Sequence, residues 1–348
     1  MIANEQITFT VVQLGDFNMD EARNVFRLAS NLQAPFRYSV SPVVFPVEPS
    51  QYELPNGGFD LDRAATDAVR TFTPRPAILV SSLPYTTADQ RSLKKDDNLF
   101  FLEEELDGEP DVSIISTYLW KTLDGKRRLQ PYILLMLAII ALHKVAKLQF
   151  HLESQSCPFD YCEPPVEIDS ALKAGQLCRE CESMVYRSVR NGSTSIYRIA
   201  AAKKLLHRAC DKRMCFIAMP FRRHMQHVYE ALDRALSEAG WTVLRADTMS
   251  RRGRITDISI EGILISDLVI ADLTGSNPNV FYELGLAHAA GCDTVLLTQD
   301  RKVPIDVALE RAIFYTNSPR GVSRAISELM RLLGTRPLTF SIPDMPNG

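Results

Sequence analysis

The stretch that decides the fold is Asp267-Leu-Val-Ile-Ala-Asp-Leu-Thr-Gly-Ser-Asn-Pro-Asn-Val-Phe-Tyr-Glu-Leu-Gly-Leu-Ala-His-Ala-Ala290. An apolar strand runs into Asp272, a turn rich in Gly, Ser, Asn and Pro follows, and a helix begins near Asn279. In open parallel sheets, ligands bind at the carboxyl ends of the strands, so we expect Asp272 and the start of the helix to face one crevice. Glu283 is expected there too, because its neighbours are too apolar for an exposed helix face.

Strands and helices alternate at short spacing on both sides of this stretch. Such alternation predicts an α/β fold, here a doubly wound, flavodoxin-like domain with a parallel five-stranded sheet. The expected strands are 215–219, 242–246, 268–273, 294–298 and 313–315, and the expected helices are 223–239, 257–266, 279–290 and 322–333.

The length of 348 residues suggests two domains. Residues 1–190 mix β-rich and helical stretches and predict an α+β domain, residues 191–213 predict a connector helix, residues 214–335 form the doubly wound domain, and 336–348 is an irregular tail. The apolar run 132–142 lies in an expected helix, 131–150. It is shorter than the roughly 20 residues of a membrane span, which favours a buried core helix.

Composition narrows the function classes. The chain is 46% hydrophobic and 23% charged, as expected of a folded soluble protein, and its net charge of −3 makes nucleic acid an unfavoured partner. The N-terminal stretch lacks the pattern of a secretory leader, so we expect a cytoplasmic protein with no membrane association. Seven cysteines, an odd number, argue against a secreted disulfide framework.

Four cysteines form two short-spaced pairs, Cys157 with Cys162 and Cys178 with Cys181. Two such pairs predict a tetrahedral zinc site, because each turn presents two thiolates and the intervening segment lets the pairs converge. Four sulfur ligands leave no open position, so the metal would be structural. The alternative is four unrelated buried thiols, but charged residues flank the second pair.

This cysteine spacing resembles the cysteine half of the archaemetzincin metalloprotease motif, H-E-x-x-H-x-x-G-x-x-H-C-x4-C followed by C-x-x-C. The positions that carry the family's three histidines and catalytic glutamate hold Ala146, Phe150, Ser156 and Lys147. His143 and His151, eight residues apart on the expected helix, do not replace them, since two ligands on one helix face need a spacing of four. The resemblance implies an inactive metalloprotease-like domain that keeps structural zinc and binds a peptide or protein partner.

The stretch quoted first resembles the nucleoside 2-deoxyribosyltransferase-like superfamily and, more distantly, TIR-type NAD hydrolases. The resemblance implies that Glu283 is the nucleophile, and it also implies a homo-oligomer, since these transferases often complete their site from a neighbouring subunit. Asn277 stands where the transferases carry an assisting Asp. The substrate-binding residues that the resemblance and the sheet topology suggest are Met219, Pro220, Phe221, Arg222, Asp247, Asp267, Asn277, Asn279 and Tyr282.

The chemistry expected of these residues is cleavage of an N-glycosidic bond in a nucleoside, nucleotide or NAD, by hydrolysis or transfer. A carboxylate stabilises the oxocarbenium-like transition state or captures the sugar. A cationic leaving group such as nicotinamide needs no proton donor, whereas a neutral base needs one, for which Asp272 or Asp247 are candidates. Arg222, at a helix start, is a candidate for binding a phosphate. The alternative is a non-enzymatic nucleotide-binding module, a sensor or signalling protein, in which Glu283 only contacts a ribose hydroxyl.

Overall fold

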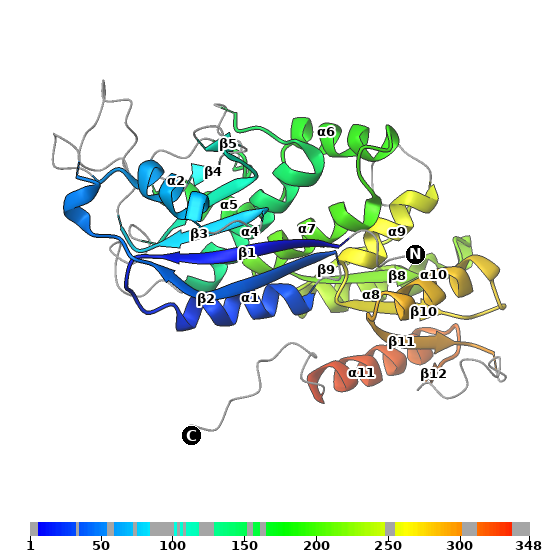
Figure 1. Cartoon of the computed structure of the whole chain (residues 1–348). Helices are drawn as coiled ribbons and strands as arrows, with labels where there is room; N and C mark the ends of the chain where they lie inside the picture. Colours follow the sequence, from blue (N-terminus) through cyan, green and yellow to red (C-terminus); the bar gives the residue numbers. More distant parts are fainter. Residues whose placement is uncertain are drawn as a thin grey trace. The chain divides into compact units, whose positions relative to one another are not determined.

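A computed structural model describes residues 6–32, 35–53, 59–71, 75–83, 101–102, 105–106, 109–117, 129–151, 156–160, 165–247, 255–300 and 312–335. The chain divides into two compact units, Met1–Asp211 and Lys212–Gly348 (Figure 1). The boundary falls within the stretch 191–213, which the sequence predicted as a connector.

The first unit is built on a sheet with the strand order β2-β1-β3-β7-β4. Its first four strands in this order are parallel, and the two-residue edge strand β4 is antiparallel to β7. The strands are β1 (Ile7–Leu14), β2 (Phe36–Phe45), β3 (Ala77–Ser81), β4 (Phe101–Leu102) and β7 (Val112–Ser116), and β5 (Glu105–Leu106) with β6 (Glu109–Pro110) forms a separate antiparallel pair.

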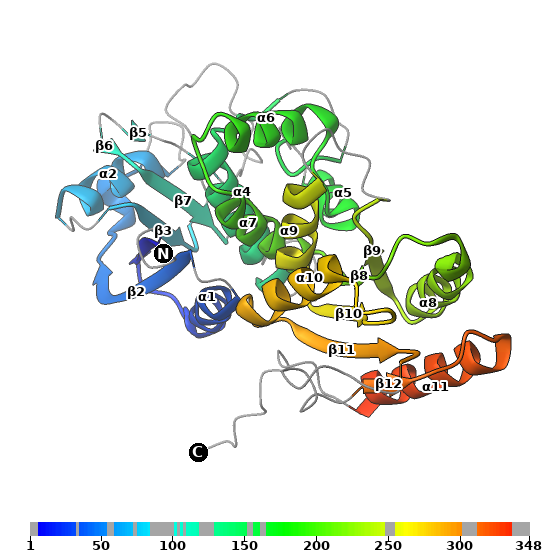
Figure 2. The same cartoon turned by 90° about the vertical axis from the view of Figure 1, so that its right-hand side faces the viewer.

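In the first unit α4 (Leu129–Ala146) contacts α1, α6 and α7 (Figure 2), whereas α2 packs against the sheet. The other helical segments are α1 (Asp20–Leu32), η2 (Pro49–Gln51), α2 (Leu61–Thr71), α5 (Pro165–Ala174), α6 (Arg179–Arg190) and α7 (Ile196–Ala209). Among the described residues, α4 is the one helix that is long and apolar enough to cross a membrane, but 78% of it is buried within the fold. It is therefore placed as a core helix, as its apolar run predicted.

The end of α4 differs from the sequence prediction. The helix stops at Ala146, and Lys147 has a positive φ of 55°. His143 lies in the last turn of the helix, and its Nδ1 is 2.7 Å from the carbonyl oxygen of Leu148. His151 lies beyond the helix in a β-bridge with Asp160, so the prediction that both histidines share one helix is wrong.

The second unit confirms the predicted doubly wound architecture. Its sheet has the order β12-β11-β10-β8-β9, and all neighbouring strands are parallel. The strands are β8 (Arg213–Ala218), β9 (Trp241–Leu244), β10 (Leu268–Asp272), β11 (Asp293–Thr298) and β12 (Ala312–Phe314). The helical segments are η3 (Arg223–Met225), α8 (Gln226–Glu238), α9 (Ile255–Ile265), α10 (Pro278–Ala289) and α11 (Pro319–Thr335).

Alternating side chains of these strands fill two apolar layers, one on each face of the sheet. Ile217 and Ile270 point to the layer that contains Leu232 of α8 and residues of α11. Phe216 and Val269 point to the opposite layer, with Leu284 of α10 and residues of α9. Because both faces are buried at its centre, the middle strand β10 begins with the continuous apolar run 268–271.

The strand order also fixes where a ligand can bind. The chain passes from β8 to β9 on one side and then returns to place β10 on the other side of β8. This reversal makes the carboxyl ends of β8 and β10 the switch point of the sheet, where a crevice forms in open α/β folds. The loops that leave these two strands begin at that end of the sheet.

Candidate functional site

The two loops at the switch point touch each other through Arg222 and Gly275. Gly275 has a φ of +73°, and a Cβ added to it would lie 3.4 Å from Nη1 of Arg222. The guanidinium therefore covers the turn between β10 and α10. In the loop that follows β8, residues 219–222, here called the first loop, Met219 and Pro220 are buried, whereas Phe221 is 58% exposed. The structure thus brings the first loop and the turn after β10 together.

Glu283 is positioned by helix α10 and by the neighbouring helix α9. Asn277 caps α10, its Oδ1 accepting a hydrogen bond of 2.9 Å from the backbone N–H of Asn279, and Pro278 occupies the first turn. The buried hydroxyl of Ser259, on α9, donates a hydrogen bond of 2.9 Å to Oε1 of Glu283. Burial raises the pKa of the Glu283 carboxyl, and the Ser259 hydrogen bond partly opposes that rise.

Asp272 is enclosed at the end of β10, with none of its surface exposed. Its Oδ1 accepts a hydrogen bond of 3.0 Å from the N–H of Thr274, and its Oδ2 accepts one of 2.5 Å from the hydroxyl of Tyr315. Gln299 in turn donates to the Tyr315 hydroxyl at 2.9 Å. Burial raises the pKa of Asp272. The prediction that Asp272 acts directly on a substrate does not fit this arrangement, because both oxygens are bound and covered.

Asp247 is held by Arg245 in a bidentate pair. Nε and Nη2 of Arg245 lie 2.6 Å and 2.8 Å from the two carboxylate oxygens. The same guanidinium is buried 3.6 Å from the ring centroid of Tyr229 and 5.5 Å from that of Phe221. Asp247 therefore orients an arginine that supports the first loop, which is a different role from the predicted proton donor.

The structure separates Asp267 from the other predicted residues. Asp267 precedes β10, and its Oδ2 accepts a hydrogen bond of 3.0 Å from the N–H of Met214 at the amino ends of the strands. Five residues of strand place it about 16 Å from Asp272. It pins β10 to β8 and does not reach the crevice. Of the two remaining predicted residues on α10, Asn279 is exposed and Tyr282 is 54% exposed on the helix surface.

Sequence reasoning missed Ser259, Tyr315 and Gln299. No spacing motif marks them, because each meets its partner across a separation of 16 to 43 residues. The position of Tyr315 in the sequence could have indicated its role. It directly follows a strand, and the carboxyl ends of parallel strands lie at the same edge of the sheet, where Asp272 also lies.

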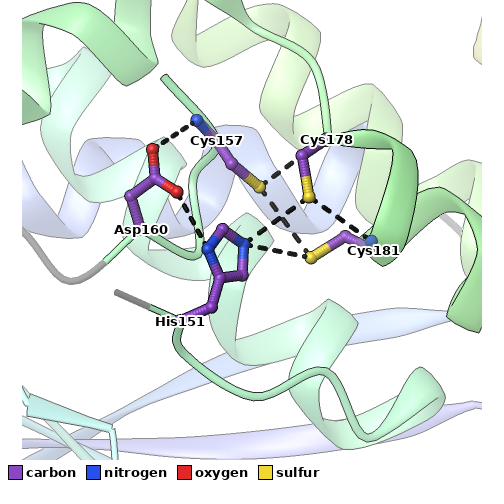
Figure 3. A network of polar contacts seen from close by, with 5 residues as sticks. All are labelled: His151, Cys157, Asp160, Cys178 and Cys181. Atoms are coloured by element: carbon purple, nitrogen blue, oxygen red, sulfur yellow. Dashed lines mark hydrogen bonds and ion pairs between the residues drawn. The ribbon is translucent and has the colours of Figure 1, made fainter. Parts of the chain in front are cut away.

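A second cluster lies in the first unit, where His151, Cys157, Cys178 and Cys181 converge (Figure 3). Their ligand atoms all lie within 4.8 Å of one another. Cys178 caps α6, its sulfur accepting from the N–H of Cys181 at 3.4 Å, and the sulfur of Cys157 accepts from the N–H of Cys178 at 3.4 Å. Three of the four predicted cysteines are thus brought together, His151 was missed, and Cys162 lies outside the described residues.

The electrostatics of this cluster suit a cation. The contact of 3.9 Å between the sulfurs of Cys157 and Cys181 lowers the pKa of Cys157 to about 5 and raises the pKa of Cys181, because a proton on one sulfur stabilises a thiolate on the other. Both residues are buried. Cysteine sulfurs packed this closely in a buried place are a donor set that a soft or borderline metal ion prefers once they are deprotonated.

Comparison with known proteins gives low-identity structural likenesses. No family model and no curated protein matches the chain. A CMP N-glycosidase, BcmB, from Clostridium botulinum is 22% identical, with 34% of this chain and 99% of that chain covered and a TM-score of 0.29. An archaemetzincin from Methanopyrus kandleri is 12% identical, with 53% and 97% covered and a TM-score of 0.38.

A third solved structure, a 2-deoxyribosyltransferase from Bacillus psychrosaccharolyticus, is 17% identical, with 29% of this chain and 85% of that chain covered and a TM-score of 0.25. Both kinds of protein that the sequence resembles are therefore among the similar structures.

Proposed function

We propose that the second unit cleaves the N-glycosidic bond of a nucleoside, nucleotide or NAD through Glu283. The observation that carries the proposal is the setting of this carboxylate. It is partly exposed, burial raises its pKa, and the Ser259 hydroxyl binds only Oε1. Oε2 has no hydrogen-bond partner among the described residues, so it is available to a substrate.

The proposed chemistry uses Glu283 as the nucleophile. Its carboxylate oxygen forms a bond to the anomeric carbon while the C–N bond breaks and its electron pair leaves with the base. Water then cleaves the glycosyl ester, which regenerates the carboxylate and frees the sugar, or another base takes the sugar instead. The water proton ends on the released base or in solvent.

The positions of the other carboxylates favour particular leaving groups. Asp272 is covered and Asp247 is bound by Arg245, so neither is presented as a free acid. A base that leaves as a neutral molecule, such as the nicotinamide of NAD, needs no acid from the protein. Among the expected substrates this arrangement favours NAD, or a nucleotide whose base is protonated by solvent.

Arg222 is the proposed phosphate ligand. Its guanidinium lies at the contact between the two loops, is exposed, and forms no ion pair with the described residues. A planar guanidinium suits bidentate binding of a phosphate, which all of the nucleotide substrates carry. We therefore expect nucleotides to bind more tightly than the corresponding nucleosides.

The alternative function is a nucleotide-binding module without turnover. Two observations favour it: Asn277 replaces the assisting Asp and caps the helix, and Asp272 is sequestered. In that case Glu283 binds a ribose hydroxyl and the protein acts as a sensor. A cytoplasmic location and a homo-oligomer stay predictions under either function.

We also propose that the cluster of the first unit holds a structural zinc ion. Thiolate and imidazole donors fit zinc, and four protein ligands leave no position for an activated water. When bound, the ion would stabilise the fold of this unit. The unit would then serve to bind a peptide or protein partner, with no peptidase chemistry.

The decisive experiment incubates the full chain with NAD, nucleotides and nucleosides and separates the products by chromatography. Release of free base from one member of the panel supports the enzyme. Saturable binding measured by calorimetry with no base released from any member supports the binding module.

A further inference from the structure

The four donor atoms of the first unit all lie within 4.8 Å of one another, and three of the distances between them match a tetrahedral site around one ion. Bonds of about 2.3 Å to sulfur and about 2.0–2.1 Å to nitrogen, at tetrahedral angles, place two sulfurs about 3.8 Å apart and a sulfur and a nitrogen about 3.6 Å apart. The sulfurs of Cys157 and Cys181 are 3.9 Å apart. Nε2 of His151 lies 3.6 Å from the sulfur of Cys178 and 3.5 Å from that of Cys181.

The ring of His151 is held so that Nε2 faces the sulfurs (Figure 3). Its Nδ1 lies 3.0 Å from Oδ1 of Asp160, a residue that is 5% exposed. The backbone N–H of His151 donates to the carbonyl of Phe159 at 2.9 Å, within the bridge to Asp160. A carboxylate at Nδ1 favours the tautomer with the ring proton on that nitrogen, in which the lone pair of Nε2 is available to a metal ion.

Asp160 also holds one of the cysteines. Its Oδ2 accepts a hydrogen bond of 3.0 Å from the N–H of Cys157. The Asp160 carboxylate thus contacts and orients two of the four donor residues, His151 and Cys157, without being a metal ligand itself.

We propose that His151 is the fourth ligand of a closed Cys3His zinc centre and that Asp160 is its positioning residue. This ligand set differs from the four-cysteine centre that the sequence predicts, since it assigns no metal contact to Cys162. It rests on the structural zinc ion proposed above and is independent of the proposed glycosidase function. Protein that holds no zinc would overturn both zinc proposals, whereas zinc bound by four sulfurs would overturn only this ligand set. The ion would join the segment after α4, which carries His151, to the start of α6, where Cys178 and Cys181 lie.

The test measures the metal directly in the full chain. X-ray absorption at the zinc edge is expected to show three sulfur ligands and one nitrogen ligand, and four sulfurs would overturn the proposal. In a second measurement the metal is replaced by Co²⁺, whose thiolate charge-transfer absorption reports the number of bound sulfurs.

Three variants separate the possible ligand sets. Cys162→Ser is expected to keep the wild-type cobalt spectrum and metal affinity. His151→Cys is expected to retain the metal with a stronger, four-thiolate absorption, which keeps the test informative if His151→Ala does not fold. Asp160→Asn is expected to keep three sulfurs and one nitrogen while lowering metal affinity about 10–100-fold.

The opposite pattern overturns the assignment. It consists of a loss of thiolate absorption and affinity in Cys162→Ser together with an unchanged spectrum in His151→Cys. An affinity of Asp160→Asn equal to that of the wild type would refute the positioning role alone.

Discussion

The hydroxyl of Tyr315 donates a hydrogen bond of 2.5 Å to Oδ2 of Asp272, across the intervening strand β11. This contact ties the residue after β12 to the last residue of β10. It therefore holds the end of β10 in place, where the turn that leads to α10 begins.

We expect Tyr315→Phe to lower the free energy of unfolding by about 1–3 kcal/mol, because a buried carboxylate loses a donor and Gln299 loses its acceptor. Urea denaturation measures the effect. Tyr282→Phe is the matched control, because the same hydroxyl is removed from a side chain that is 54% exposed. Equal effects of the two substitutions would show that the contact adds no stability.

The pH dependence of stability should carry a contribution from Asp272. Burial raises its folded-state pKa above the ordinary value of 3.8, so the folded protein binds this proton more tightly than the unfolded chain does. The stabilisation is fully present below pH 3.8 and is lost as the pH rises through the folded-state pKa. Unfolding measured from pH 4 upward is expected to show a loss of stability in the wild type that Asp272→Asn lacks. The same dependence of unfolding free energy on pH in the wild type and in Asp272→Asn would contradict this contribution of Asp272.

Glu283→Gln separates catalysis from binding. The amide keeps the shape but removes the charge that stabilises a cationic transition state, so base release should fall by several orders of magnitude while ligand affinity changes little. Chromatography and calorimetry follow the two quantities. Glu238→Gln, an exposed residue at the end of α8, is the control and should leave both unchanged. A Glu283→Gln variant as fast as the wild type would eliminate the mechanism.

Ser259→Ala should move the acid limb of the pH–rate profile to higher pH. The nucleophile must be ionised, so activity is lost as the pH falls through the pKa of Glu283. The Ser259 hydrogen bond lowers that pKa, and its removal raises it. Ser266→Ala removes another buried hydroxyl, one that bonds the carbonyl of Gly262, and should leave the limb in place. A limb that does not move in Ser259→Ala would mean that another group sets it.

The zinc-loaded chain should show no peptidase activity. Ala146, the last residue of α4, and Lys147, with its positive φ, stand where the archaemetzincin motif places a histidine and the catalytic glutamate. Neither side chain can bind a metal and activate its water. Incubation with casein and a fluorogenic peptide tests this. Cleavage that copurifies with the chain and is lost on chelation would disprove the alignment.

The fold of the second unit was predictable because its central strands are buried on both faces, and the continuous apolar run 268–271 in β10 records that burial directly. The chemistry of the carboxylates was less predictable. Asp267 and Asp272 bracket the same strand, and only the strand direction shows that one lies at the amino edge and the other at the carboxyl edge. The end of α4 was missed because a positive φ at Lys147 leaves no signature in hydrophobic spacing.

The contact between Gly275 and Arg222 restricts how the second unit can be re-engineered. A side chain at position 275 meets two obstacles, an unfavourable left-handed backbone and the guanidinium 3.4 Å from the new Cβ. Shortening the side chain at position 222 removes only the second obstacle, because the backbone at position 275 stays left-handed. Attempts to alter the charge at this end of the sheet should therefore vary position 222 and keep glycine at position 275.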